Sequence, residues 1–170
     1  ASPPGVPKTD WTELFFADGS SEPLQHVSST PKPTSTCPGF DPRVCPANLT
    51  TAAASYPDAS TIALLRHASA ASFMSKLRIP TLLMQGEADT LFNINDVTAN
   101  YRGIKANGAP VKLVLQSWGH SNSTPAPGEF DESNPPSSYE GQLILNWFDH
   151  YLKGLGVSTG PEVEYFRDWV

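Results

Sequence analysis

Short apolar runs and longer amphipathic stretches alternate through the second half of the chain. The runs 79–86 and 110–115 are apolar at most positions, which is typical of buried strands in a parallel sheet. Between them, apolar residues recur at helical spacing over 95–106, and 137–153 carries a second such stripe that ends before Gly154. This order of strand, helix, strand and helix predicts an α/β fold in which parallel strands are joined by a right-handed crossover and flanked by helices.

The first half of the chain has no comparable periodicity. Ser, Thr, Pro and Ala dominate it, and we expect the segments 2–7 and 28–36 to be irregular. Four apolar residues between Trp11 and Phe16 gather on a predicted short helix, with Asp10 as its N-cap. Because so few apolar positions do not make an independent core, we expect this half to pack on another part of the protein.

These contrasts predict three regions along the chain. Residues 1–61 form a Pro- and Ser-rich segment, residues 62–155 form the α/β segment, and residues 156–170 are either a linker or the first strand of a further domain. The strand in the last region is predicted at 163–166, and we expect its partners to lie beyond the end of the chain.

Composition narrows the classes of partner. The 170 residues include 17 acidic and 11 basic side chains, so the formal net charge is −6. A protein that binds the nucleic-acid backbone needs a basic face, so no nucleic-acid partner is expected. No apolar stretch reaches the roughly 18 residues of a membrane-spanning helix, so no membrane span is expected. The proline content, about twice the usual ~5%, indicates a globular chain with many loops.

The two cysteines, Cys37 and Cys45, lie close together in a segment that Pro38, Gly39 and Pro42 bend. A local disulfide is the favoured interpretation, and closing so short a loop stabilises a fold by about 2–3 kcal/mol. It favours an oxidising compartment, and so a secreted or extracytoplasmic protein. The alternative is a pair of reduced thiols in a cytosolic loop. No Cys or His cluster has the spacing of metal ligands, so neither a metal nor another cofactor is expected.

Asp89 and His120 are the strongest candidates for chemistry. Each follows a predicted strand, and α/β proteins place their sites at the carboxyl ends of the strands. An aspartate there accepts a hydrogen bond from a histidine ring, fixes its tautomer and stabilises the imidazolium formed in general-base catalysis. Taken singly, Asp89 is better explained as a turn residue and His120 as a loop histidine with a structural hydrogen bond. Together, in this order, they match the acid and base of an α/β-hydrolase.

The nucleophile of such an enzyme is not found. The motif Gly-x-Ser-x-Gly, whose sharp turn projects the serine, does not occur in the chain. In the α/β-hydrolase order the serine precedes the acid and the histidine, so we expect it on sequence upstream of this chain. The chain is then the C-terminal half of a hydrolase domain, and by itself it is expected to be inactive.

Three segments resemble one family. The segment 79–93, IPTLLMQGEADTLFN, resembles the acid-bearing segment of the X-Pro dipeptidyl-peptidase and cocaine-esterase family, the S15-like peptidases. The segment 108–120, which ends in Trp-Gly-His, resembles that family's histidine segment. The segment 147–154, WFDHYLKG, resembles the helix that closes its hydrolase domain. The three agree in order and spacing, and the resemblance covers about residues 62 to 155.

The resemblance implies a serine hydrolase that forms an acyl-enzyme and uses no metal. Its substrates would be small peptides cleaved after proline, esters or related acyl compounds. Asp89 would be the acid of the triad and His120 the general base, and the partner would be the upstream half of the same domain, which carries the serine. Residues 1–60 would belong to the family's helical cap, and 157–170 to the start of its C-terminal jelly-roll domain.

Two aromatic residues next to the candidate pair are weaker candidates. Phe92 and Trp118 are predicted to line a substrate pocket, although core packing explains Trp118 equally well. The alternative function, from a different class, is a non-catalytic α/β module that binds a partner through the loops of its Pro-rich half. A further alternative is one product of proteolytic nicking, held to a fragment that carries the serine.

Overall fold

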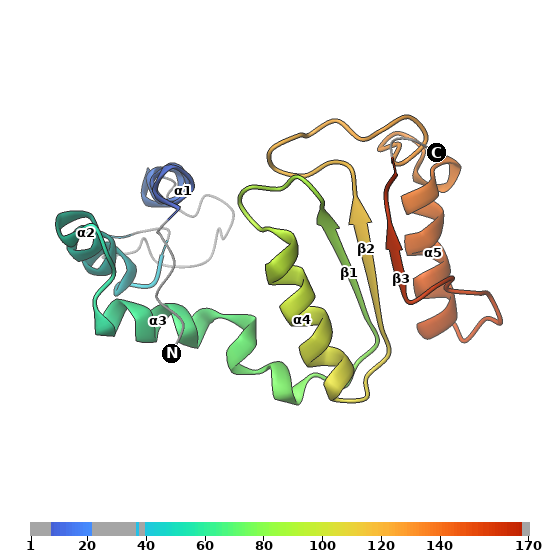
Figure 1. The fold of residues 1–170 in the computed structure, drawn as a ribbon, viewed down its shortest axis with the longest axis horizontal. Helices are drawn as coiled ribbons and strands as arrows, with labels where there is room; N and C mark the ends of the chain where they lie inside the picture. Colours follow the sequence, from blue (N-terminus) through green and yellow to red (C-terminus); the bar gives the residue numbers. More distant parts are fainter. Residues whose placement is uncertain (1–7, 22–36, 38–39, 168–170) are drawn as a thin grey trace, which may run out of the picture. The chain divides into compact units, whose positions relative to one another are not determined.

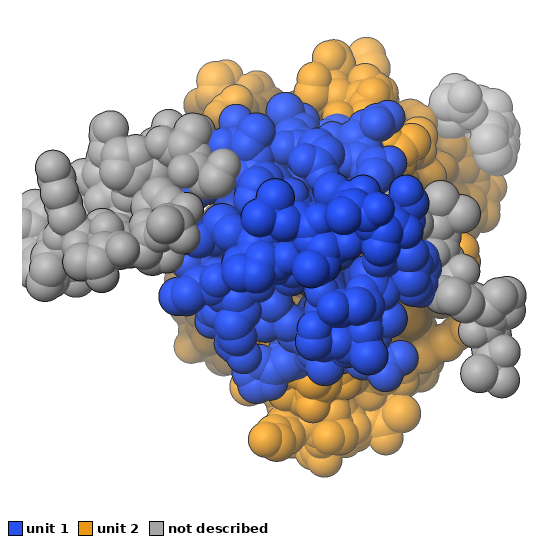
Figure 2. All heavy atoms as spheres, turned by 90° about the vertical axis from the view of Figure 1, so that its left-hand side faces the viewer, with its two compact units in different colours: residues 1–69 blue, residues 70–170 orange. Residues whose placement is uncertain are grey.

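The computed structural model describes residues 8–21, 37 and 40–167, in two compact units that divide after Ser69. Unit 1 spans Ala1–Ser69 and unit 2 spans Ala70–Val170 (Figure 2). The irregular segments predicted at 2–7 and 28–36 lie outside the described residues. The three-region division of the chain stays a prediction.

Unit 1 is helical where it is described. Its helices are α1 (Thr9–Ser21), α2 (Val44–Ala54) and α3 (Ala59–Ala68). Helix α1 confirms the predicted short helix but begins two residues earlier, at Thr9, so Asp10 lies in its first turn rather than at its N-cap. The sequence predicted neither α2 nor α3. Helix α2 buries no residue, which agrees with the absence of an apolar stripe in its sequence. Asp58 caps α3 by accepting a hydrogen bond from the Thr61 amide at 2.7 Å.

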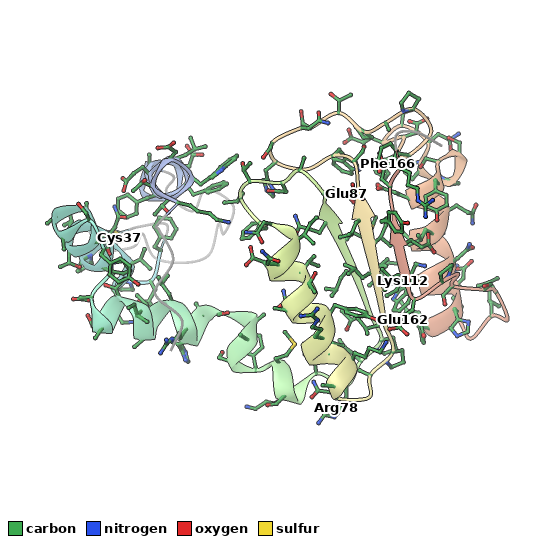
Figure 3. The ribbon with its side chains drawn as sticks, in the orientation of Figure 1. Cys37, Arg78, Glu87, Lys112, Glu162 and Phe166 are labelled. Atoms are coloured by element: carbon green, nitrogen blue, oxygen red, sulfur yellow. A yellow bond between two sulfur atoms is a disulfide. The ribbon has the colours of Figure 1, made fainter. Side chains whose placement is uncertain are left out.

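The predicted disulfide is present in unit 1. Cys37 and Cys45 are bonded, and Cys45 lies in the first turn of α2. The bond therefore ties α2 to the segment that precedes it. The Cys37 side chain, labelled in Figure 3, is buried. Phe40 stacks on Phe16 of α1 with ring centroids 5.9 Å apart.

Unit 2 is built on a three-stranded parallel sheet in the order β1-β2-β3 (Figure 1). The strands are β1 (Thr81–Gly86), β2 (Val111–Gln116) and β3 (Val163–Tyr165). Along the chain, helix α4 (Ile94–Ala106) connects β1 to β2, and helix α5 (Tyr139–Tyr151) connects β2 to β3. The short 3₁₀ turns are η1 (Ala70–Ser72), η2 (Met74–Lys76) and η3 (Pro135–Ser137). Three parallel strands flanked by helices confirm the predicted α/β class.

The core of unit 2 lies between α4 and one face of the sheet. Ile104 of α4 packs with Ala109 and Val111, and all three are buried. Four partly buried residues pack around them: Met74, Leu77, Leu83 and Tyr101. Because side chains alternate along a strand, Lys112 and Val114 point to the opposite face.

Contacts of Lys112 join the elements on that opposite face. Its side chain is 2% exposed, forms an ion pair with Glu164 of β3 and donates to the Pro161 carbonyl oxygen at 2.5 Å (labelled in Figure 3). Tyr139, the first residue of α5, also donates to Glu164. A charge is tolerated in such a place only when it is paired. The three contacts hold β2, β3 and the start of α5 together.

The strand predicted at 163–166 has its partner inside the chain. Strand β3 pairs with β2, with Val163 opposite Leu113, so the expectation of partners beyond the end was wrong. The physical reason is the connection through α5, which returns the chain to the side of β2. None of the described helices is long and apolar enough to cross a bilayer.

Candidate active site

The candidate pair lies at the carboxyl edge of the sheet. Glu87 and Phe166, which directly follow β1 and β3, are labelled at that edge in Figure 3. The Glu87 amide donates to the Gln116 carbonyl at 2.8 Å, so the β1–β2 ladder continues to the last residue of β2. Asp89 follows in a tight turn, its amide donating to the Gly86 carbonyl at 3.3 Å.

Asp89 is buried and fully engaged as an acceptor. Its side chain is 2% exposed, and Oδ1 accepts from the amides of Leu91 at 2.8 Å and Phe92 at 3.0 Å. Oδ2 accepts from the His120 amide at 3.1 Å and lies 2.8 Å from His120 Nδ1. Burial opposes ionisation, but these hydrogen bonds outweigh it and lower the pKa of Asp89 to about 2. The residue is therefore a carboxylate at neutral pH.

His120 presents one ring nitrogen to Asp89 and half of its surface to solvent. Because an ionised carboxylate only accepts hydrogen bonds, His120 Nδ1 carries a proton and donates it in a hydrogen bond to Asp89. Nε2 lies on the other side of the ring, and the side chain is 47% exposed. The Phe92 ring meets the imidazole edge-on, with centroids 5.8 Å apart. A histidine held this way has the tautomer and the orientation of a general base.

Two glycines allow the turn that carries His120, residues 117–120 and here called the histidine turn, to approach β1 and the loop that follows it. A Cβ atom on Gly86 would lie 2.3 Å from the Trp118 carbonyl oxygen, and one on Gly119 would lie 2.8 Å from Asp89 Oδ2. A side chain at Gly86 would force the turn away, because the contact is with backbone, and one at Gly119 would press on the Asp89 carboxylate. A further bond joins the two loops, since the Thr90 amide donates to Ser121 Oγ at 2.8 Å.

The two aromatic candidates occupy different surroundings. Phe92 lies beside the His120 ring and is 52% exposed. Trp118 instead stacks on Phe130 with centroids 5.5 Å apart and donates from Nε1 to Glu140 at 3.0 Å. The structure brings Phe92 to the pair and gives Trp118 packing contacts. A role for either in holding substrate stays a prediction.

Two buried glutamates near the histidine turn were missed by the sequence. Glu129 accepts from the Ser117 amide at 2.7 Å and from the Ser117 hydroxyl, and also from the Ala126 amide at 3.0 Å. Glu140, in the first turn of α5, is 1% exposed. An acidic residue in a first helical turn is ordinary, so nothing in the sequence distinguishes Glu140 from a solvated one.

A cavity of about 550 Å³ lies on the α5 side of the sheet. Glu129, Glu140, Glu164 and Phe166 are among its lining residues, whereas Asp89 and His120 are not. The cavity and the candidate pair are therefore separate features of unit 2. Among the described residues, no group of three or more His, Cys, Asp or Glu side chains is arranged to hold a metal ion.

Comparison with known proteins gives a match to one family model. Residues 47–122 match the family model of the X-Pro dipeptidyl-peptidases of the S15 family, over somewhat less than half of the chain. No curated protein and no solved structure matches the chain significantly. The S15 family has the α/β-hydrolase fold, in agreement with the parallel sheet of unit 2. The match spans both Asp89 and His120, and over this segment it confirms the S15-like, hydrolase resemblance that the sequence predicted.

Proposed function

We propose that this chain supplies the acid and the base of an S15-like serine hydrolase that acts through an acyl-enzyme. The observation that carries the proposal is the 2.8 Å separation between Asp89 Oδ2 and His120 Nδ1. In the proposed reaction, His120 Nε2 takes the proton of the serine hydroxyl as the serine attacks the acyl carbon, and then gives it to the leaving group. Asp89 keeps the ring in the required tautomer and stabilises the imidazolium.

The serine in this proposal comes from a separate segment, the upstream half of the same domain. The 170 residues contain no Gly-x-Ser-x-Gly motif. Among the described residues, β1 is an edge strand whose only neighbour is β2. An edge strand offers unpaired amide and carbonyl groups to a further strand. The proposed half would add its strands along β1 and bring the serine to the carboxyl edge where His120 lies.

The substrates we propose are small peptides cleaved after proline, or esters and related acyl compounds. The match to the S15 family model supports a peptide substrate. An acyl-enzyme reaction can also take an ester, which supports the second class. We also propose a secreted or extracytoplasmic location, which the Cys37–Cys45 disulfide supports because such bonds persist in oxidising compartments.

The test is hydrolysis of a prolyl dipeptide anilide and a nitrophenyl ester by the full-length product of the gene. We expect His120→Ala and Asp89→Asn each to lower kcat by about 10⁴-fold or more, because the base is lost or held in the wrong tautomer. The matched control is His150→Gln on α5, whose ring contacts the Val157 carbonyl at 2.9 Å, and kcat should not change.

The same assay separates the alternatives. The 170-residue chain alone should show no turnover above background, and turnover that His120→Ala abolishes would mean that the chain has its own nucleophile. If the full-length product is folded yet hydrolyses neither substrate above background, the non-catalytic binding module is the better interpretation.

A further inference from the structure

Three residues of the histidine turn, Ser117, Trp118 and His120, each contact a different buried carboxyl group. Ser117 donates to Glu129, the Trp118 indole donates to Glu140 at 3.0 Å, and His120 contacts Asp89 at 2.8 Å. The three carboxyl residues are all less than a tenth exposed. Burying a carboxyl group costs free energy unless it is hydrogen-bonded. Three buried carboxyl groups that are hydrogen-bonded to one turn therefore restrict the conformation of that turn.

The three carboxyl groups belong to different elements of unit 2. Asp89 belongs to the loop after β1, whereas Glu140 belongs to α5. Glu129 lies in the loop that docks on the start of α5, because the amides of Tyr139 and Glu140 donate to the carbonyls of Gly128 and Glu129 at 3.0 and 2.9 Å. The turn is therefore clamped between β1 and the first turn of a helix.

Glu140 keeps its proton to a higher pH than an exposed glutamate. One of its oxygens accepts the Trp118 indole hydrogen, and the other, Oε1, is buried with no hydrogen-bond partner among the described residues. Burial raises the pKa of Glu140 to about 7; the Trp118 hydrogen bond opposes this and the neighbouring Glu129 adds to it. A neutral carboxyl still accepts from the indole, and it avoids placing two like charges side by side.

We propose that Glu129 and Glu140 are positioning residues, which fix the turn at Ser117 and Trp118 so that His120 meets Asp89 in one geometry. The functional value of that geometry rests on the proposed function, but the positioning itself does not. Neither glutamate touches the His120 ring in the described contacts. Glu129 acts through Ser117, three positions before His120, and Glu140 acts through Trp118, two positions before it. Removing either anchor should therefore loosen the Asp89–His120 contact without removing a group from it.

The experiment is nuclear magnetic resonance of the full-length product of the gene labelled with ¹⁵N at histidine, following exchange of the His120 Nδ1 proton with water. Glu140→Leu removes the acceptor at similar volume, and we expect the proton to exchange about tenfold faster or its signal to disappear, as for one lost hydrogen bond. Glu140→Gln keeps an acceptor oxygen and should restore the wild-type rate. Glu129→Leu should also speed exchange, because it removes the acceptor of the Ser117 amide.

The matched control is Glu132→Leu, which changes an exposed glutamate in the same loop and should leave the rate unchanged. If Glu140→Leu does not fold, Trp118→Phe removes only the indole donor while keeping a ring against Phe130, and it should also speed exchange. An unchanged rate in folded Glu140→Leu or Trp118→Phe would overturn the proposal. Because no turnover is measured, this result is independent of whether the proposed hydrolase activity is found.

Discussion

Gly86 shows how one absent side chain sets the candidate site. The last residue of β1 lies against the Trp118 carbonyl, which would be 2.3 Å from a Cβ atom there. The contact is with backbone, so it cannot be relieved by a rotamer change. The missing Cβ is what lets the histidine turn lie against β1, next to Asp89.

We therefore predict that Gly86→Ala lowers the free energy of unfolding by about 1–3 kcal/mol, the usual cost of overpacking. It should also speed exchange of the His120 Nδ1 proton, because the turn is pushed away from Asp89. Urea denaturation and the histidine spectrum measure the two effects. Gly156→Ala is the control, since a Cβ there meets nothing within 4 Å. Equal stability of the two variants would contradict this account of Gly86.

Glu140 gives a pH dependence whose sign follows from its environment. Its pKa rises from 4.5 to about 7 on folding, chiefly through burial. Between these values the unfolded chain has released a proton that the folded chain keeps. The free energy of unfolding therefore falls as pH rises through this window and levels off above it.

We predict that Glu140→Gln removes this fall. Relative to the wild type, the variant should gain about 1–3 kcal/mol between pH 4.5 and pH 8, measured by urea denaturation at each pH. Glu129, Tyr139, Glu164 and Arg167 line the same cavity, and they are present in both proteins, so the difference isolates Glu140. A constant difference across this range would mean that Glu140 is already ionised in the fold.

At the scale of elements, α4 carries its own start signal. Asn93 accepts from the Asn95 amide at 2.9 Å, and Asp96 accepts from the Asn93 amide at 3.1 Å, which completes a capping box. The cap directly follows Phe92, so it also fixes where the loop from Asp89 ends. Helix α4 then covers the core face of the sheet.

Loss of this cap should cost about 1 kcal/mol of unfolding free energy in Asn93→Ala. Asn93→Asp keeps a side-chain acceptor and should remain close to the wild type. Urea denaturation of the three proteins at one pH checks the prediction. A variant with alanine that is as stable as the wild type would show that Asp96 alone suffices to start the helix.

The elements that the sequence predicted are those with strong local patterns. The runs 79–86 and 110–115 are apolar enough to show β1 and β2, and their shared edge led to the proximity of Asp89 and His120. Helix α2 has no buried residue, and its sequence carries no apolar periodicity that would predict a helix. The pairing of β3 and the burial of Glu140 depend on contacts between distant residues, which a local pattern does not contain.

At the scale of the molecule, two features bear on function. The described chain has two compact units, and the candidate pair, its turn and the α5 anchors all belong to unit 2. Within unit 2, one strand edge is available on β1 for further strands. The proposed acid and base therefore lie in one compact unit, and the proposed nucleophile would come from another segment.

The most direct test of that claim is the rate at which a fluorophosphonate labels serine in the full-length product of the gene. The account predicts one labelled serine, with a rate that His120→Ala and Asp89→Asn each lower by about 10³-fold or more, because an unactivated serine hydroxyl is a weak nucleophile. His150→Gln should not change the rate. No labelled serine, or a labelling rate that is the same in all four proteins, would contradict the claim that Asp89 and His120 activate a nucleophile.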